Sequence, residues 1–171
     1  DKGKLYAYED LLAAVDETEP HGPLIDPLDD RFFDALGEGG VINKIREYCD
    51  ATGQQIPTGE GEITRCLLES LATRSAIAIE DLGVVAEGHA RRLHVVGGGV
   101  RNKIFCQMMA SALGHPVEAG PVEATAIGNV ISQMVAAGEI ASYERGRRLV
   151  EMNGDLDRYE PRNWEAWDET V

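Results

Sequence analysis

The feature that most constrains the fold is a strand–glycine–helix–strand pattern in residues 93–119. The run LHVV at 93–96 is continuous, apolar and β-branched, which is typical of a strand buried on both faces. Residues 101–113 carry apolar side chains at helical spacing, and Gly114 ends that helix. PVEA at 116–119 is a second short strand. Two strands joined by a helical connection of this length indicate a right-handed parallel crossover.

Most of the remaining chain is predicted to be helical. Helices are expected over residues 7–16, 41–49, 59–80 or slightly beyond, 122–137 and 141–150. The three prolines of residues 20–30 predict a loop instead. Apolar side chains at helical spacing are expected to face the core; they are Leu11, Leu12, Val15, Val41, Ile45, Tyr48, Ile63, Leu67, Leu71, Ala78, Leu82, Ile104, Phe105, Met108, Met109, Ala112 and Leu113. A short helix is expected to bring Phe32, Phe33 and Leu36 to the core, followed by a break at 37–40. The small residues Ala124, Ala126 and Gly128 are expected to let the start of helix 122–137 pack closely against a neighbour.

Size and charge narrow the class of protein. The 171 residues fit one domain, and 30 acidic against 16 basic residues give a net charge of −14. A surface this negative repels nucleic acid and anionic lipid, so neither is an expected partner. No apolar run reaches the roughly 20 residues of a membrane helix, and no signal peptide is visible. We therefore expect a cytoplasmic protein.

The cysteines, acids and histidines do not form a recognisable metal or disulfide pattern. The three cysteines are expected to be buried and reduced, although Cys49 and Cys66 are able to pair if the fold brings them together; the third is Cys106. Asp26, Asp29 and Asp30 lack the glycine and terminal glutamate of a calcium loop and are read as capping or solvated residues. His21, His89, His94 and His115 lack zinc-ligand spacing. No metal site is expected.

Three consecutive glycines at a strand–helix junction predict a phosphate site. Gly97, Gly98 and Gly99 leave the backbone bare at a helix N-terminus, where N–H groups point outward, whereas a tight turn alone explains only one or two of them. The dinucleotide-binding fingerprint is matched only in part, because Asn102 stands where its third glycine belongs, although Glu118 lies at the distance of the ribose-binding acid. No Walker A loop is present.

Three longer stretches together resemble the C-terminal domain of the FGGY carbohydrate kinases. They are LIDPLDDRFF at 24–33, IREYCDATGQQIPTGEGEITRCLLESLA at 45–72, and LHVVGGGVRNKIFCQMMASALGHPVEAGPVEATAIGN at 93–129. This family has the actin-like ATPase fold, whose halves are ribonuclease H-like. The resemblance implies that residues 1–171 are a single domain, the C-terminal nucleotide-binding part of such a kinase. It further implies a partial ribonuclease H-like α/β domain, mostly helical with a short parallel sheet, whose early strands are missing. Those strands are expected either upstream of Asp1 or in a partner chain.

The resemblance also implies roles for individual residues. Gly98 matches the family's nucleotide-contacting glycine, Gly97 and Gly99 shape the loop, and Asn102 matches a polar position one turn into the next helix, near the adenosine. ATP and Mg²⁺ are the expected cofactors. No catalytic residue is expected in this chain, because the family's catalytic aspartate and most sugar contacts lie in an N-terminal half. The chain alone is therefore predicted to be inactive.

The sugar and some side roles stay open at this point. The three stretches most resemble the family members that phosphorylate L-rhamnulose at O1. Alternatives are another ketose or polyol kinase of the family, acting on fuculose or xylulose, and a non-catalytic nucleotide-binding module. Glu123 is read as a helix-dipole residue or as a neighbour of the nucleotide. Arg145, Arg147 and Arg148 are read as a solvated helix face, and Trp164 and Trp167 as residues that pack the C-terminal tail.

Overall fold

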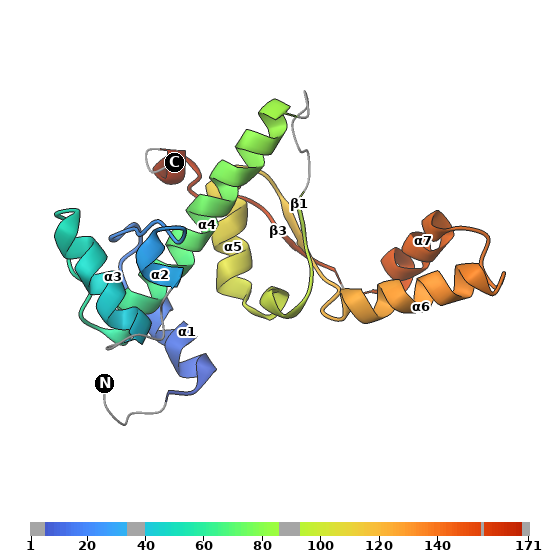
Figure 1. Cartoon of the computed structure of the whole chain (residues 1–171), viewed down its shortest axis with the longest axis horizontal. Coiled ribbons are helices and arrows are strands. Elements are labelled where there is room, and N and C mark those ends of the chain that lie inside the picture. The colour runs from blue at the N-terminus through green and yellow to red at the C-terminus, as the bar shows by residue number, and fades with distance from the viewer. Residues whose placement is uncertain (1–5, 34–39, 86–92, 155, 169–171) are drawn as a thin grey trace. The chain divides into compact units, whose positions relative to one another are not determined.

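The computed structural model describes residues 6–33, 40–85, 93–154 and 156–168 (Figure 1). The chain divides into two compact units, each with its own core. Unit 1 is Asp1–Leu82 with Glu165–Val171, and unit 2 is Gly83–Trp164. The prediction that the whole chain is a single domain stays a prediction.

The regular secondary structure that the structure describes in unit 1 is all helical, and loops join the helices. Its helices are α1 (Tyr8–Asp16), α2 (Asp30–Phe33), α3 (Gly40–Ala51), α4 (Glu60–Val85) and α8 (Glu165–Asp168). The predicted longest helix is confirmed as α4, which has 26 residues. The Glu62 carboxylate caps its start by accepting the backbone N–H groups of Thr58 at 2.7 Å and Gly59 at 3.2 Å. These two hydrogen bonds, with one from the Thr58 hydroxyl, lower the pKa of Glu62.

The core of unit 1 joins the loop before α2 to α3 and α4. Its buried residues are Ile25, Ile45, Cys49 and Cys66, and Phe32, Tyr48, Ile63 and Leu67 pack against them. Val15 of α1 is also fully buried, and Leu11 and Leu12 are half-buried, as predicted. Phe33 is 75% exposed and Val41 39% exposed, so the prediction that both face the core is wrong. Leu36 lies outside the described residues.

The predicted inward face of α4 is partly wrong, because polar residues replace leucines there. Leu71, Ala78 and Leu82 are exposed. The buried side instead carries Glu69 and Ser70, together with Cys66, Ala72, Thr73 and Ala76. The physical reason lies in the irregular loop that packs on this side: Ser70 Oγ accepts the backbone N–H of Ile25 at 2.9 Å, and Glu69 Oε1 accepts that of His21 at 3.2 Å. Buried backbone groups require such partners, so α4 turns polar side chains inward.

Unit 2 contains a small sheet and three longer helices. Its elements are β1 (Leu93–Val95), the 3₁₀ helix η1 (Gly98–Arg101), α5 (Lys103–Leu113), β2 (Val117–Ala119), α6 (Ala124–Ala136), α7 (Tyr143–Asn153) and β3 (Asp157–Tyr159). The order is β1-β2-β3, with β1 and β2 parallel and β2 and β3 antiparallel. The predicted parallel pair is confirmed. The expected short parallel sheet is in fact mixed, because β3 adds an antiparallel edge.

Helix α5 packs on the sheet and forms the core of unit 2. Val100, Cys106 and Ala119 are buried there, and Val95, Val122 and Tyr159 pack against them. Met108 and Met109 are each 7% exposed, which confirms that they are core residues. The prediction that β1 is buried on both faces is wrong: the His94 side chain is 52% exposed and lies 3.1 Å from the Glu118 carboxylate.

Helices α6 and α7 pack against each other through a close contact. A Cβ atom at Gly146 of α7 would lie 2.5 Å from Ile131 Cγ2 of α6, so any side chain there would require Ile131 to shift. The predicted thin surface at the start of α6 makes no such contact, since Gly128 is exposed and an added Cβ would meet no atom within 4 Å. In the part of the chain that the structure describes, no helix is long and apolar enough to cross a membrane.

Candidate functional site

The three glycines after β1 form a corner between the strand and η1, here called the glycine corner (Gly97, Gly98 and Gly99). Gly97 has φ 87° and ψ −168°, a conformation that favours glycine strongly. Its N–H donates to the carbonyl of Pro121 at 3.2 Å, and the Gly120 N–H donates to the carbonyl of Val95 at 2.8 Å. The loop after β2 therefore forms one side of the corner and fixes its backbone.

The glycine corner is open to solvent rather than covered by other side chains. Gly98 and Gly99 are exposed, and a Cβ atom added at any of the three glycines would have no heavy atom within 4 Å. The backbone conformation accounts for Gly97 alone. Packing and φ do not require glycine at Gly98 or Gly99. Their missing side chains instead leave the main chain accessible to a ligand, as a phosphate-binding loop requires.

Asn102 caps α5, so part of its polar side chain is already engaged. Its Oδ1 accepts the backbone N–H of Phe105 at 2.9 Å, and the residue is 6% exposed. The residue was expected one turn into the helix; it follows the single turn of η1 and is the N-cap of α5. Because Oδ1 is engaged, Nδ2 is the donor through which Asn102 would contact a ligand. Its contact with adenosine stays a prediction.

Two exposed charged residues flank the glycine corner. Arg101 ends η1, and its guanidinium lies 3.9 Å from the carboxylate of Glu123, the N-cap residue of α6. The sequence had singled out Glu123 but not Arg101. The signal that could have identified Arg101 is its position: it is a basic residue just after the glycine-rich turn. Glu118, the acid considered for a ribose contact, is 14% exposed and lies against His94 instead.

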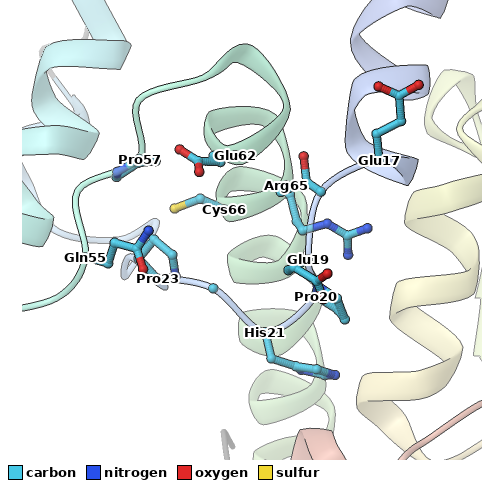
Figure 2. Close-up of a pocket in the computed structure, with 12 residues that line it drawn as sticks. Glu17, Glu19, Pro20, His21, Pro23, Gln55, Pro57, Glu62, Arg65 and Cys66 are labelled. Atoms are coloured by element: carbon cyan, nitrogen blue, oxygen red, sulfur yellow. The ribbon is translucent and has the colours of Figure 1, made fainter.

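Unit 1 contains a cavity, but the side chains that line it do not suit a phosphate. It has a volume of about 530 Å³ and is formed by the loop after α1, residues before α4 and the first turns of α4 (Figure 2). Three carboxylates line it: Glu17, Glu19 and Glu62. The guanidinium of Arg65, also in the wall, donates to Glu69 Oε1 at 2.9 Å and to the carbonyl of Val15 at 2.7 Å. Its charge is thus already neutralised.

The described residues contain no group of three or more His, Cys, Asp or Glu side chains arranged to hold a metal ion. Of the loop acids, Asp26 accepts the backbone N–H of Leu28 at 3.0 Å, and Asp29 pairs with Arg31 at 2.8 Å. Both act as local loop-stabilising residues, as expected. The imidazole ring of His21 contacts the ring of Trp167, with 5.3 Å between the two ring centroids.

The three cysteines are free and buried, so the alternative of a Cys49–Cys66 disulfide is not realised. Burial raises the pKa of all three thiols, for Cys66 to about 12. Thiols that stay protonated and enclosed are poor nucleophiles. They belong to the cores of the two units, Cys49 and Cys66 to unit 1 and Cys106 to unit 2.

Comparison with known proteins places these features in a family. Residues 1–137 match the C-terminal domain of the FGGY family of carbohydrate kinases. A rhamnulokinase of Bacteroides thetaiotaomicron is 41% identical over 162 residues, which cover 95% of this chain and 33% of that protein. A rhamnulokinase of Bacillus subtilis is 35% identical over 158 residues, 92% of this chain and 32% of that protein. The chain thus spans about a third of the length of these curated relatives.

Solved structures agree on the fold. Plasmodium falciparum glycerol kinase, solved with ADP, superposes with a TM-score of 0.66 at 16% identity and covers 96% of this chain and 32% of its own. Xylulose kinase from Rhodospirillum rubrum superposes with a TM-score of 0.52 at 20% identity, over 68% of this chain and 24% of its own. At these identities the likeness concerns the fold alone.

Proposed function

Because the chain belongs to the FGGY family of carbohydrate kinases and matches its C-terminal domain, we propose that it forms the nucleotide-binding part of a sugar kinase. The observation that carries the proposal is the open glycine corner, where Gly98 and Gly99 expose main chain that packing does not require to be bare. ATP is the proposed ligand. Because relatives named rhamnulokinase match more than 90% of the chain, the proposed sugar is L-rhamnulose, phosphorylated at O1.

Each residue of the site has a proposed role. Gly98 contacts the nucleotide through its main chain, since any side chain there would stand between backbone and ligand. Gly97 and Gly99 shape the corner, and the positive φ of Gly97 sets the direction in which η1 leaves the strand. Asn102 offers Nδ2 to the adenosine, with Oδ1 held by the N-terminus of α5.

In this proposal, the reaction also requires groups from outside this chain. Phosphoryl transfer depends on a positioned nucleophile and on neutralisation of the phosphate charge by Mg²⁺. The described residues hold no metal-ligand cluster, so in the proposal Mg²⁺ is carried by the phosphates and by residues outside this chain. The catalytic aspartate and the sugar contacts likewise belong to an N-terminal domain. This agrees with the chain covering about a third of its relatives.

The test compares the isolated chain with the whole kinase that carries it. Both are assayed for ADP release with ATP, Mg²⁺ and, in parallel, L-rhamnulose, L-fuculose and D-xylulose, and the phosphorylated carbon is identified by NMR. We expect L-rhamnulose to give the highest kcat/KM in the whole kinase and the isolated chain to be inactive. Turnover by the isolated chain would contradict the division of roles. Preference for another ketose would replace the proposed sugar, and ADP binding without turnover of any sugar would favour a non-catalytic module.

A further inference from the structure

The glycine corner is bracketed by one ion pair, between Arg101 and Glu123. Gly97 donates to Pro121, so Glu123, two residues further on, follows directly from the loop that forms one side of the corner. Arg101 ends η1, which starts at Gly98 on the other side. The guanidinium and the carboxylate approach to 3.9 Å, while both side chains remain more than 70% exposed. The pair therefore joins the two chain segments that enclose the exposed glycines.

We propose that Arg101 is a nucleotide-binding residue of this site: its guanidinium leaves Glu123 and binds a phosphate of ATP lying on the glycine corner. Glu123 is then a competitor that holds the guanidinium beside the corner when no nucleotide is bound. This inference rests on the proposed function, because it names a further residue at the same site.

The negative charge of the chain favours a local cation at a phosphate site. With a net charge of −14, the protein repels a polyanion such as ATP at long range. Main-chain N–H groups supply only partial charges, so an arginine at the edge of the corner adds the full positive charge that they lack. A guanidinium is also the side chain that matches phosphate oxygens with two parallel hydrogen bonds.

The geometry of the pair shows that Arg101 is available for exchange. Other arginine–carboxylate pairs between described residues are shorter: Arg65–Glu69 at 2.9 Å, Arg148–Glu144 at 2.6 Å and Arg158–Glu160 at 2.7 Å. Arg65 is moreover largely buried and donates to backbone as well. An exposed pair at 3.9 Å contributes little to folding, so exchanging its carboxylate for a phosphate costs little stability.

The experiment measures the KM for ATP and the dissociation constant of ADP in the whole kinase. We expect Arg101→Ala to raise both about tenfold or more, as loss of a charge-assisted hydrogen bond does, and to leave the KM for the sugar unchanged. Arg101→Lys should recover part of the loss. Glu123→Gln should act in the opposite direction and tighten ADP binding about twofold to threefold, because the competing carboxylate is gone. Adenosine, which lacks phosphate, should bind all variants alike.

The matched control is Arg148→Ala in α7, which removes the same charge from another exposed pair and should leave the KM for ATP unchanged. Equal effects of Arg101→Ala and Arg148→Ala would reduce the result to net charge and overturn the inference. So would an unchanged KM in Arg101→Ala, or losses of the same sign in Arg101→Ala and Glu123→Gln, which would indicate a structural pair. A wild-type kinase that binds no adenine nucleotide would instead refute the proposed function, so the two failures are distinguishable.

Discussion

At the scale of single residues, the three glycines of the corner have different physical requirements. Gly97 occupies a conformation with φ 87° that costs a residue with a side chain about 1–3 kcal/mol. Gly98 and Gly99 have neither a positive φ nor a neighbour within 4 Å of an added Cβ. Glycine is thus required at position 97 for folding. In the proposed function, glycine is required at Gly98 for nucleotide binding, and substitutions at the two positions distinguish these requirements.

We predict that Gly97→Ala lowers the free energy of unfolding of the chain by about 1–3 kcal/mol, because alanine is strained at this φ. Gly98→Ala should change it by less than about 0.5 kcal/mol, as surface substitutions without contacts do. In the proposed function, Gly98→Ala should nevertheless raise the KM of the whole kinase for ATP by about tenfold, or 1.4 kcal/mol, because the methyl group would separate main chain from nucleotide. Urea unfolding and steady-state kinetics measure the two effects.

Gly22→Ala serves as the control for Gly98→Ala, since Gly22 lies in a loop of unit 1 with no atom within 4 Å of an added Cβ and no positive φ. Both substitutions should leave stability unchanged, but Gly22→Ala should also leave the KM for ATP unchanged. If Gly98→Ala binds ATP as well as the wild type does, the open corner is not the nucleotide contact.

At the scale of elements, α1 and α4 meet at a position where only glycine fits. A Cβ atom at Gly61, in the first turn of α4, would lie 2.5 Å from the carbonyl oxygen of Ala14 and closer still to the Thr18 hydroxyl. The obstacle is backbone of α1, which does not yield as a flexible side chain does. The end of α1 is also tied to α4 by Arg65, which donates to the carbonyl of Val15.

We predict that Gly61→Ala destabilises the chain by about 1–3 kcal/mol, the usual cost of overpacking, even though alanine favours helix. Gly59→Ala is the matched control, because Gly59 lies two residues away with no atom within 4 Å of an added Cβ, and its N–H to Glu62 is retained. Thermal unfolding followed by circular dichroism measures both variants. Equal melting temperatures for the two would show that α1 moves away from α4 at no cost, contrary to the packing described.

The elements also show how far the sequence alone leads. Hydrophobic runs of ordinary length predicted β1, β2 and the helices that follow them, because local patterns determine such elements. Strand β3 was not predicted: its residues Asp157, Arg158 and Tyr159 are largely polar, and it exists because it pairs with β2 at the edge of the sheet. Edge strands carry such polar residues, and pairing between distant segments leaves no local signal.

The prediction of which face of α4 is buried fails for a similar reason: the contacts that decide it come from residues far away in the sequence. Periodicity favoured Leu71 and Leu82 as core residues, yet Ser70 and Glu69 are buried because their side chains accept backbone N–H groups of the loop 45 and 48 residues earlier. The glycine corner could be predicted because a strand, three glycines and a helix are contiguous. Arg101 and Glu123 could not be paired from sequence, because β2 and its loop bring them together.

At the scale of the whole molecule, the three buried cysteines are natural probes of how the two units unfold. Cys49 and Cys66 lie in the core of unit 1, and Cys106 in that of unit 2. Their thiol pKa values are raised by burial, so the resulting stability is complete below the ordinary thiol pKa of about 8.5 and is lost as the pH rises, for Cys66 toward about 12. Near pH 8 the thiols should therefore react with an alkylating reagent only when their unit opens.

We predict that the three cysteines become reactive together, in one urea transition. The chain enters unit 2 through α4 and returns to unit 1, where Trp167 is 6% exposed and contacts His21. Both ends of unit 2 are thus connected to unit 1 along the chain, which favours joint unfolding. Pulsed alkylation at pH 8 over a urea series, with peptide mass spectrometry, gives a midpoint for each cysteine. A midpoint for Cys106 that differs from the shared midpoint of Cys49 and Cys66 would show that the units are separate domains. Trp167→Ala, which loosens the return to unit 1, should separate the midpoints if this tie couples them.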